Sequence, residues 1–134
     1  LTPNPALALK NGKPFMTFGT PGGDVQIQAM AQVAANVLYF GMDIQTAIEA
    51  PRFATYSFPS SFAPHTYHPG LLMLERRIGE ATGAELTARG HKVDWWVDWT
   101  WKAGGVCAVL CDPSNETRIQ AGADPRRVGR ALGR

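Results

Sequence analysis

The chain has 134 residues, of which 45% are hydrophobic and 18% are charged. This apolar fraction, with so little charge, excludes a wholly disordered chain. The formal net charge of +2 is too small to indicate a nucleic-acid partner. No apolar run reaches the roughly 18 residues that a membrane-spanning helix needs.

The sequence opens Leu1-Thr2-Pro3, with no initiator methionine and no basic segment leading into an apolar stretch. We therefore expect no signal peptide within it, and we interpret residues 1–134 as a single-domain fragment of a longer protein. Fourteen glycines and ten prolines indicate many short elements joined by tight turns, not a helix bundle.

The first elements predicted along the chain form a β-hairpin. Apolar runs at 6–10 and 14–20 flank the dipeptide Asn11-Gly12. Both turn residues tolerate positive φ, so this arrangement is a strong signal for an antiparallel pair.

Two helices are predicted next. Apolar residues recur every three to four positions over 24–39, beside a separate polar stripe of Gln28, Gln32 and Asn36. This helix carries almost no charge, so we expect it to be buried on two sides. Asp43 can cap a second helix over 44–50.

The rest of the chain predicts short strands and one more helix. The strands are expected at 52–56, 71–75, 91–101, 104–111 and 118–121, the helix at 78–89, a loop at 57–70 and a turn at 112–115. Strands thus fall at both ends of the chain, with helices between them. This order predicts an α+β fold, an antiparallel sheet covered by helices, and not a repeating parallel βαβ sheet.

The two cysteines, Cys107 and Cys111, lie in one predicted strand. Their Cα atoms are then about 13 Å apart, whereas a disulfide needs less than about 7 Å. We expect two buried free thiols that pack as small apolar groups. Unpaired thiols mildly favour a reducing compartment.

Gly22-Gly23, between a strand and the uncharged helix, is the strongest candidate for chemistry. Glycines there allow a sharp turn and a close approach of another group. Free N–H groups at a helix start favour anions, so they could hold a carboxylate, a phosphate or the oxyanion of an acyl-transfer intermediate. From the spacing alone, a plain tight turn is favoured over such an anion-binding site.

Four tryptophans, at positions 95, 96, 99 and 101, lie in the strand expected over 91–101. On an extended segment, Trp95, Trp99 and Trp101 would share one face. A packing patch in the core or between chains is favoured over a ligand-stacking surface.

The segment Asp124-Pro125-Arg126-Arg127 leaves two interpretations open. Its arginines could bind phosphate or carboxylate, or the segment could be a structural turn in which Asp124 pairs locally, which is favoured. For His65, His68 and His91 a surface or structural role is favoured, because no serine or cysteine motif accompanies them.

Several segments, taken in order, resemble γ-glutamyltranspeptidases. They are Pro14-Phe15 to Gly19-Thr20-Pro21-Gly22-Gly23, Val33 to Asn36, Phe40-Gly41-Met42, Ala47 to Phe53, Leu86 to His91 and Gly122 to Arg127. Single motifs are moderately specific, whereas the ordered set, spanning nearly the whole chain, is strong.

The resemblance implies the C-terminal part of the small subunit of an N-terminal-nucleophile hydrolase, with an αββα sandwich fold. Such a precursor cuts itself, and the new N-terminal threonine acts as the nucleophile with its own amine as base. That threonine lies upstream of this segment, so we expect the isolated chain to be inactive. The resemblance assigns oxyanion-hole amides to Gly22 and Gly23, and substrate binding to Thr2.

The implied substrates are γ-glutamyl amides such as glutathione, and the implied partner is the remainder of the same enzyme. The family has a Ser-Ser pair where this chain has Leu1-Thr2, and residues 54–70 also depart from its pattern. An acylase of another amide, of cephalosporin type, and a non-catalytic binding module are the alternatives. No metal or organic cofactor is implied. The oligomeric state stays open, and the family is often periplasmic or extracellular.

Overall fold

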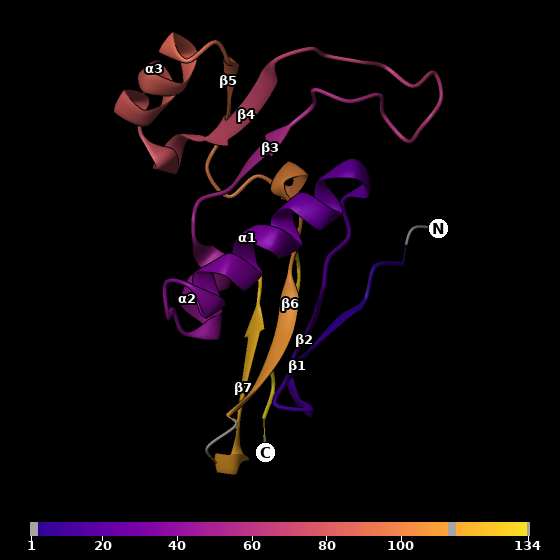
Figure 1. Cartoon of the computed structure of the whole chain (residues 1–134), viewed down its shortest axis with the longest axis vertical. Coiled ribbons are helices and arrows are strands. Elements are labelled where there is room, and N and C mark those ends of the chain that lie inside the picture. Colours follow the sequence, from indigo (N-terminus) through magenta and orange to yellow (C-terminus); the bar gives the residue numbers. More distant parts are fainter. Residues whose placement is uncertain (1–2, 113–114, 134) are drawn as a thin grey trace.

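The computed structural model describes residues 3–112 and 115–133, so the expected turn at 112–115 lies partly outside the described residues. Figure 1 shows a long sheet with helices on one face and a smaller sheet above it. The larger sheet has the order β1-β2-β6-β7 and is antiparallel throughout. Its strands are β1 (Ala6–Lys10), β2 (Lys13–Gly19), β6 (Cys107–Asp112) and β7 (Asn115–Ala123).

The smaller sheet has the order β3-β4-β5. Its strands are β3 (Phe53–Thr55), β4 (Leu71–Glu75) and β5 (Lys92–Trp96). The helices of the chain are α1 (Gln26–Leu38), α2 (Ile44–Glu49) and α3 (Glu80–Ala88), and short 3₁₀ turns cover Gly23–Val25, Arg76–Ile78 and Trp101–Ala103. None of the helices in the described ranges is long and apolar enough to cross a membrane.

The hairpin and the first two helices form where the sequence predicts them. Asn11 and Gly12 both have positive φ, 54° and 77°, as the tight turn between β1 and β2 requires. The Asp43 carboxylate accepts hydrogen bonds from the N–H groups of Gln45 (3.1 Å) and Thr46 (3.0 Å), which caps α2.

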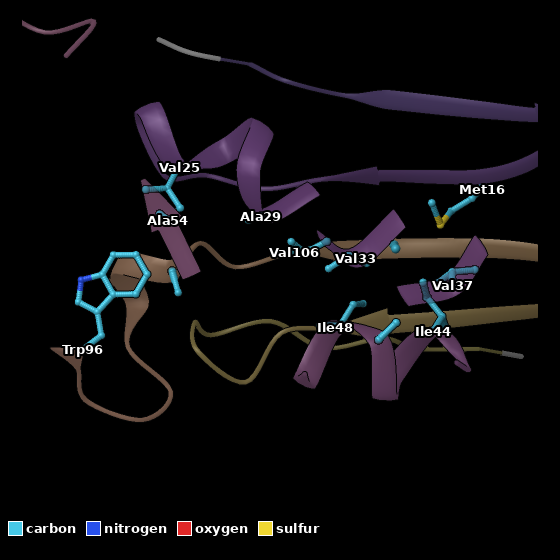
Figure 2. Packing of buried hydrophobic residues seen from close by; sticks show 13 residues of the cluster. Met16, Val25, Ala29, Val33, Val37, Ile44, Ile48, Ala54, Trp96 and Val106 are labelled. Carbon is cyan, nitrogen blue, oxygen red and sulfur yellow. The ribbon is translucent and has the colours of Figure 1, made fainter. Parts of the chain in front are cut away.

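The core lies between α1, α2 and the larger sheet. Figure 2 shows Val33 of α1 and Ile48 of α2 near Val106, which precedes β6, with Met16 of β2 farther along. Val33, Ile48 and Val106 have no measurable exposure, and Met16 is 1% exposed. Each such side chain contributes roughly 1.5–3 kcal/mol through burial, so this face fixes how α1 lies on the sheet.

A second face of α1 packs against β3 through the polar stripe. Gln28 donates to the Thr55 carbonyl (3.1 Å) and accepts from the Thr55 N–H (2.8 Å). Gln32 does the same with Phe53, at 2.9 and 3.1 Å. The two amide side chains act as an extra strand along the edge of β3, and α1 is packed on two sides as expected.

The α+β class is as expected, and the small sheet includes one parallel pair, β4 and β5, joined through α3. Two expectations about the aromatic segment are corrected. The aromatic strand ends at Trp96, because Trp99 has a φ of 58° and a 3₁₀ turn begins at Trp101. Trp95, Trp99 and Trp101 therefore do not share one face of a strand.

Cys107 is exposed rather than buried, and Cys111 is partly exposed. The alternation along β6 explains this. Val106 and Ala108 point into the core under α1, so the odd-numbered positions face away from it. Both thiols are free.

Candidate active site

The turn at Gly22-Gly23 connects the end of β2 to α1. Gly22 has a φ of 141° and Gly23 a φ of 57°, values that residues with a side chain rarely adopt. The Val25 N–H donates to the Gly22 carbonyl (3.2 Å) and closes a 3₁₀ turn that leads into the helix. The glycines thus turn the chain sharply between two packed elements.

Thr20 fixes this turn against the segment that precedes β6. Its hydroxyl accepts a hydrogen bond from the Gly105 N–H (2.7 Å) and donates to the Pro21 carbonyl (2.8 Å). The Thr20 carbonyl accepts from the buried Gln26 side chain (2.7 Å). A Cβ at Gly104 would lie 2.9 Å from the Thr20 hydroxyl, so a glycine is needed there for the close approach.

The backbone N–H groups of Gly22 and Gly23 are adjacent in the chain. Neither donates a hydrogen bond to an acceptor within residues 3–112 and 115–133. They lie at the start of α1, where the helix dipole favours negative charge. Two fixed donors at such a position can bind an anion or a developing oxyanion.

A pocket of about 480 Å³ lies beside Gly23. One side of it is formed by Pro3 and Asn4, and another by Phe58 and Phe62 of the loop between β3 and β4. Thr2, to which the resemblance assigns substrate binding, and Leu1, which departs from the family at the neighbouring position, lie outside the described residues. The pocket therefore lies between the glycine turn and Pro3-Asn4, the two residues that directly follow Thr2.

Asp24, at the edge of this pocket, holds the loop. The Ser60 hydroxyl donates to its carboxylate (2.9 Å), as does the Ser61 N–H (3.1 Å). Hydrogen bonds from Ser61 and then Ser60 lower the pKa of Asp24, against the opposing effect of burial, so the carboxylate is ionised at neutral pH. Sequence reasoning missed this contact because no local spacing links residues that are 36 positions apart.

The histidines do not form a second site. His65, His68 and His91 are exposed, and His65 lies with Nδ1 2.8 Å from the Ser60 carbonyl oxygen within its own loop. No group of three or more His, Cys, Asp or Glu side chains that could hold a metal ion occurs among the described residues.

The Asp124-Pro125-Arg126 turn belongs to a buried cluster of charges. Arg126 binds Glu75 in a bidentate pair, Nε to Oε1 at 2.7 Å and Nη2 to Oε2 at 2.6 Å. Asp124 pairs with Arg52 at 2.7 Å and with Arg126 at 3.1 Å. Burial alone would raise the pKa of Glu75, but the hydrogen bond and charge of Arg126 outweigh it and hold that pKa below its usual range.

The same cluster ties separate elements together. Arg52 and Arg126 both donate to the carbonyl of Ile48 at the end of α2 (2.7 and 3.0 Å). Asp124 accepts from the Val106 N–H (3.0 Å), next to the segment that Thr20 holds. The structural interpretation of Asp124 and Arg126 is therefore confirmed, and the cluster supports the scaffold of the glycine turn.

The tryptophans that follow β5 stack on arginines. The guanidinium of Arg77 lies 3.6 Å from the ring centre of Trp99, and that of Arg127 lies 5.3 Å from Trp101. Trp96 alone of the four is buried in the core. The predicted packing patch is thus divided between one core side chain and exposed cation–π pairs.

Comparisons with known proteins relate this geometry to a class of enzymes. The family model for γ-glutamyltranspeptidase matches residues 2–134. A glutathione hydrolase-like proenzyme (YwrD) of Bacillus subtilis strain 168 is 33% identical over 129 residues, which cover 96% of this chain and 23% of that protein. The solved structure of LmbA2991HD is 40% identical, with a TM-score of 0.83, over 91% of this chain and 21% of that one. The structure of cephalosporin acylase from Bacillus halodurans is 27% identical, with a TM-score of 0.76, over 91% of this chain and 20% of that one.

The fold is therefore that of the N-terminal-nucleophile hydrolases, an α+β arrangement that forms part of an αββα sandwich. The chain belongs to the γ-glutamyltranspeptidase family. It spans less than a quarter of the lengths of these relatives.

Proposed function

We propose that this chain works as part of a self-processing threonine amidohydrolase or acyltransferase, in which the N–H groups of Gly22 and Gly23 stabilise the oxyanion. The observation that carries the proposal is the pair of adjacent N–H groups without an acceptor in the described ranges, fixed at the start of α1. The family resemblance makes γ-glutamyl amides such as glutathione the first substrates to test.

In the proposed reaction, the hydroxyl oxygen of a threonine outside this chain attacks the carbonyl carbon of the amide. The carbonyl oxygen gains the negative charge, which the two N–H groups offset by hydrogen bonds. The C–N bond then breaks, and the amine leaves with the proton that the hydroxyl gave to the nucleophile's own α-amine. Water or another amine then takes the acyl group from the threonine. Because that threonine is proposed to lie outside this chain, the isolated chain is expected to show no turnover.

The test compares two glycines with similar backbone strain. Gly23 and Gly41 have φ values of 57° and 64°, and a Cβ at Gly41 would meet nothing within 4 Å. In the intact enzyme, Gly23→Ala and Gly41→Ala should each cost about 1–2 kcal/mol in stability. Gly23→Ala keeps its N–H group, but relief of the backbone strain at Gly23 moves that donor away from the oxyanion. Only this variant should therefore also lower turnover, by up to about 10²–10³, the effect of losing one oxyanion donor.

A contact with Phe62 must be separated from the effect on the N–H groups. A Cβ at Gly23 would lie 2.9 Å from Cε2 of Phe62, so the substitution also displaces that ring. The double variant Gly23→Ala/Phe62→Ala removes this clash and should remain impaired relative to Phe62→Ala. If Gly23→Ala folds, processes itself and turns over like Gly41→Ala, the oxyanion role is wrong.

A second candidate function is an acylase that acts on a different amide. Leu1 stands where the family has a serine that could donate a hydrogen bond, which favours this reading. Comparing γ-glutamyl anilides with other acyl anilides on the intact enzyme distinguishes the two. A marked γ-glutamyl preference would reject the acylase.

A further inference from the structure

The long connection between β3 and β4 reaches across to the start of α1 (Figure 1). It has neither helix nor strand, but it is held by hydrogen bonds of its own. The Ser60 N–H donates to the Thr66 carbonyl (2.9 Å), and the His65 N–H donates to the Phe62 carbonyl (2.7 Å). The Gly70 N–H donates to the Ser57 hydroxyl (3.0 Å). The loop therefore has a defined shape at its tip.

Asp24 fixes that tip beside the glycine turn. Its carboxylate accepts both the Ser60 hydroxyl and the Ser61 N–H, from residues immediately before Phe62. Because Asp24 directly follows Gly23, this contact joins the loop to the two free N–H groups. The position of the Phe62 ring is thus tied to the position of the turn.

Two aromatic side chains of the loop line the pocket next to the turn. The Phe62 ring occupies the space that a Cβ at Gly23 would need, yet it remains 53% exposed. Phe58 is 37% exposed and lines the same pocket, as does Ile27 on α1, which is 74% exposed. Within the described part of this chain, large apolar surface is therefore exposed beside the donors that would hold the reacting carbonyl.

We propose that Phe58 and Phe62 determine which acyl group the enzyme accepts, and that they select an apolar acyl group, aromatic or aliphatic, over γ-glutamyl. The inference rests on the proposed function, because it takes the reacting carbonyl to lie at Gly22 and Gly23. An acyl chain that extends from there into the pocket covers Phe62, Phe58 and Ile27 and removes their apolar surface from water.

The Asp24 carboxylate at the pocket edge would repel the α-carboxylate of a γ-glutamyl group and attract its α-ammonium group. Its charge therefore does not decide between the two kinds of substrate, and the apolar lining is what favours an apolar acyl group. The Asp24 carboxylate already accepts hydrogen bonds from the loop, so it acts as a loop anchor.

The kinetic test uses the intact processed enzyme and two 4-nitroanilides, one of phenylacetic acid and one γ-linked to L-glutamic acid. The wild type should have the higher kcat/KM on the phenylacetyl compound. Phe62→Ala should lower that value about tenfold or more, as expected for lost apolar contact in an acyl pocket. It should change the γ-glutamyl value less than about threefold.

Tyr67→Ala is the matched control. Tyr67 is an aromatic residue of the same loop with the same 53% exposure, and it does not line the pocket. Its truncation should leave both kcat/KM values unchanged. Three results would overturn the proposal: a faster wild-type reaction on the γ-glutamyl compound, an equal loss on both compounds in Phe62→Ala, or the same selective loss in Tyr67→Ala.

A binding measurement separates this inference from the proposed reaction. Saturation-transfer NMR on the same protein should detect phenylacetate more strongly than L-glutamate, and Phe62→Ala should weaken the phenylacetate signal. If neither anilide is hydrolysed but phenylacetate binds in this manner, the proposed reaction fails and the pocket assignment stands. If phenylacetate does not bind, or binds equally well to Phe62→Ala, the pocket assignment is wrong.

Discussion

Glu75 is the residue on which the buried charges depend. Its carboxylate has no measurable exposure and accepts hydrogen bonds from Arg126, from Arg77 (3.0 Å) and from the Arg52 N–H (2.9 Å). Two cationic side chains, those of Arg126 and Arg77, thus pair with this carboxylate, and the buried Arg52 side chain pairs with the second anion, Asp124. Removing either anion leaves buried positive charge without a partner, which is far more costly than removing a surface ion pair.

Glu75→Gln should therefore destabilise the protein by about 3–5 kcal/mol. Glu85→Gln is the control, because Glu85 forms an exposed ion pair with Arg89 on α3, with both side chains more than 60% exposed. That change should cost less than about 1 kcal/mol. Urea unfolding of both variants measures the difference, and similar midpoints would show that the buried cluster does not stabilise the fold.

The residues of this cluster also mark the limit of what the sequence could predict. Arg52 and Asp124 were noticed as parts of motifs, because motifs are local. Glu75 closes an apolar strand and gave no signal, since its partners Arg52 and Arg126 are 23 and 51 positions away. The turn at Gly22-Gly23 was predicted from those two residues alone. The position of Phe62 beside it was not, because Phe62 is also far from the turn in the sequence.

At the scale of elements, α1 hydrogen-bonds the outer edge of β3, where a further strand would otherwise pair. The polar stripe was visible in the sequence, but its role was not, because periodicity reports which face is polar and says nothing of its partner. The side-chain amides of Gln28 and Gln32 each supply one donor and one acceptor. They thereby bond the backbone N–H and carbonyl groups of Thr55 and Phe53, two alternate residues of β3. The edge of β3 is thereby closed to other strands.

The double variant Gln28→Ala/Gln32→Ala should open this edge. We expect the Phe53 and Thr55 N–H groups to exchange with solvent at least tenfold faster, since both lose their acceptors. Stability should fall by about 1–3 kcal/mol. Amide exchange measured by NMR checks both, with the N–H groups of the β2–β6 pair as an internal control. Unchanged exchange at Phe53 and Thr55 would contradict this role for α1.

For the whole molecule, the cluster predicts how stability depends on pH. The folded-state pKa of Glu75 lies below its ordinary value of 4.5. Its contribution is therefore complete above about pH 4.5 and is lost as the pH falls through the lower, folded-state pKa. The free energy of unfolding should fall with acid below that point, and less steeply in Glu75→Gln. Equal acid sensitivity of the variant and the wild type would reject the assignment to Glu75.

The elements of the fold were predictable from the sequence where short-range sequence features determine them. The Asn11-Gly12 hairpin, α1 and the Asp43 cap are set by turn chemistry, periodicity and capping, and all three formed as expected. The parallel pairing of β4 with β5 and the early end of the aromatic strand depend on tertiary packing. The Arg77–Trp99 stack is part of that packing, and no pattern within 91–101 could indicate it.

The central claim, that Gly22 and Gly23 hold the oxyanion, is tested most directly by a crystal structure of the processed enzyme with an acyl group trapped on its threonine. The account predicts the acyl carbonyl oxygen within about 2.7–3.1 Å of the backbone nitrogens of both glycines. A carbonyl oxygen bound to other donors, and more than about 4 Å from both nitrogens, would contradict it.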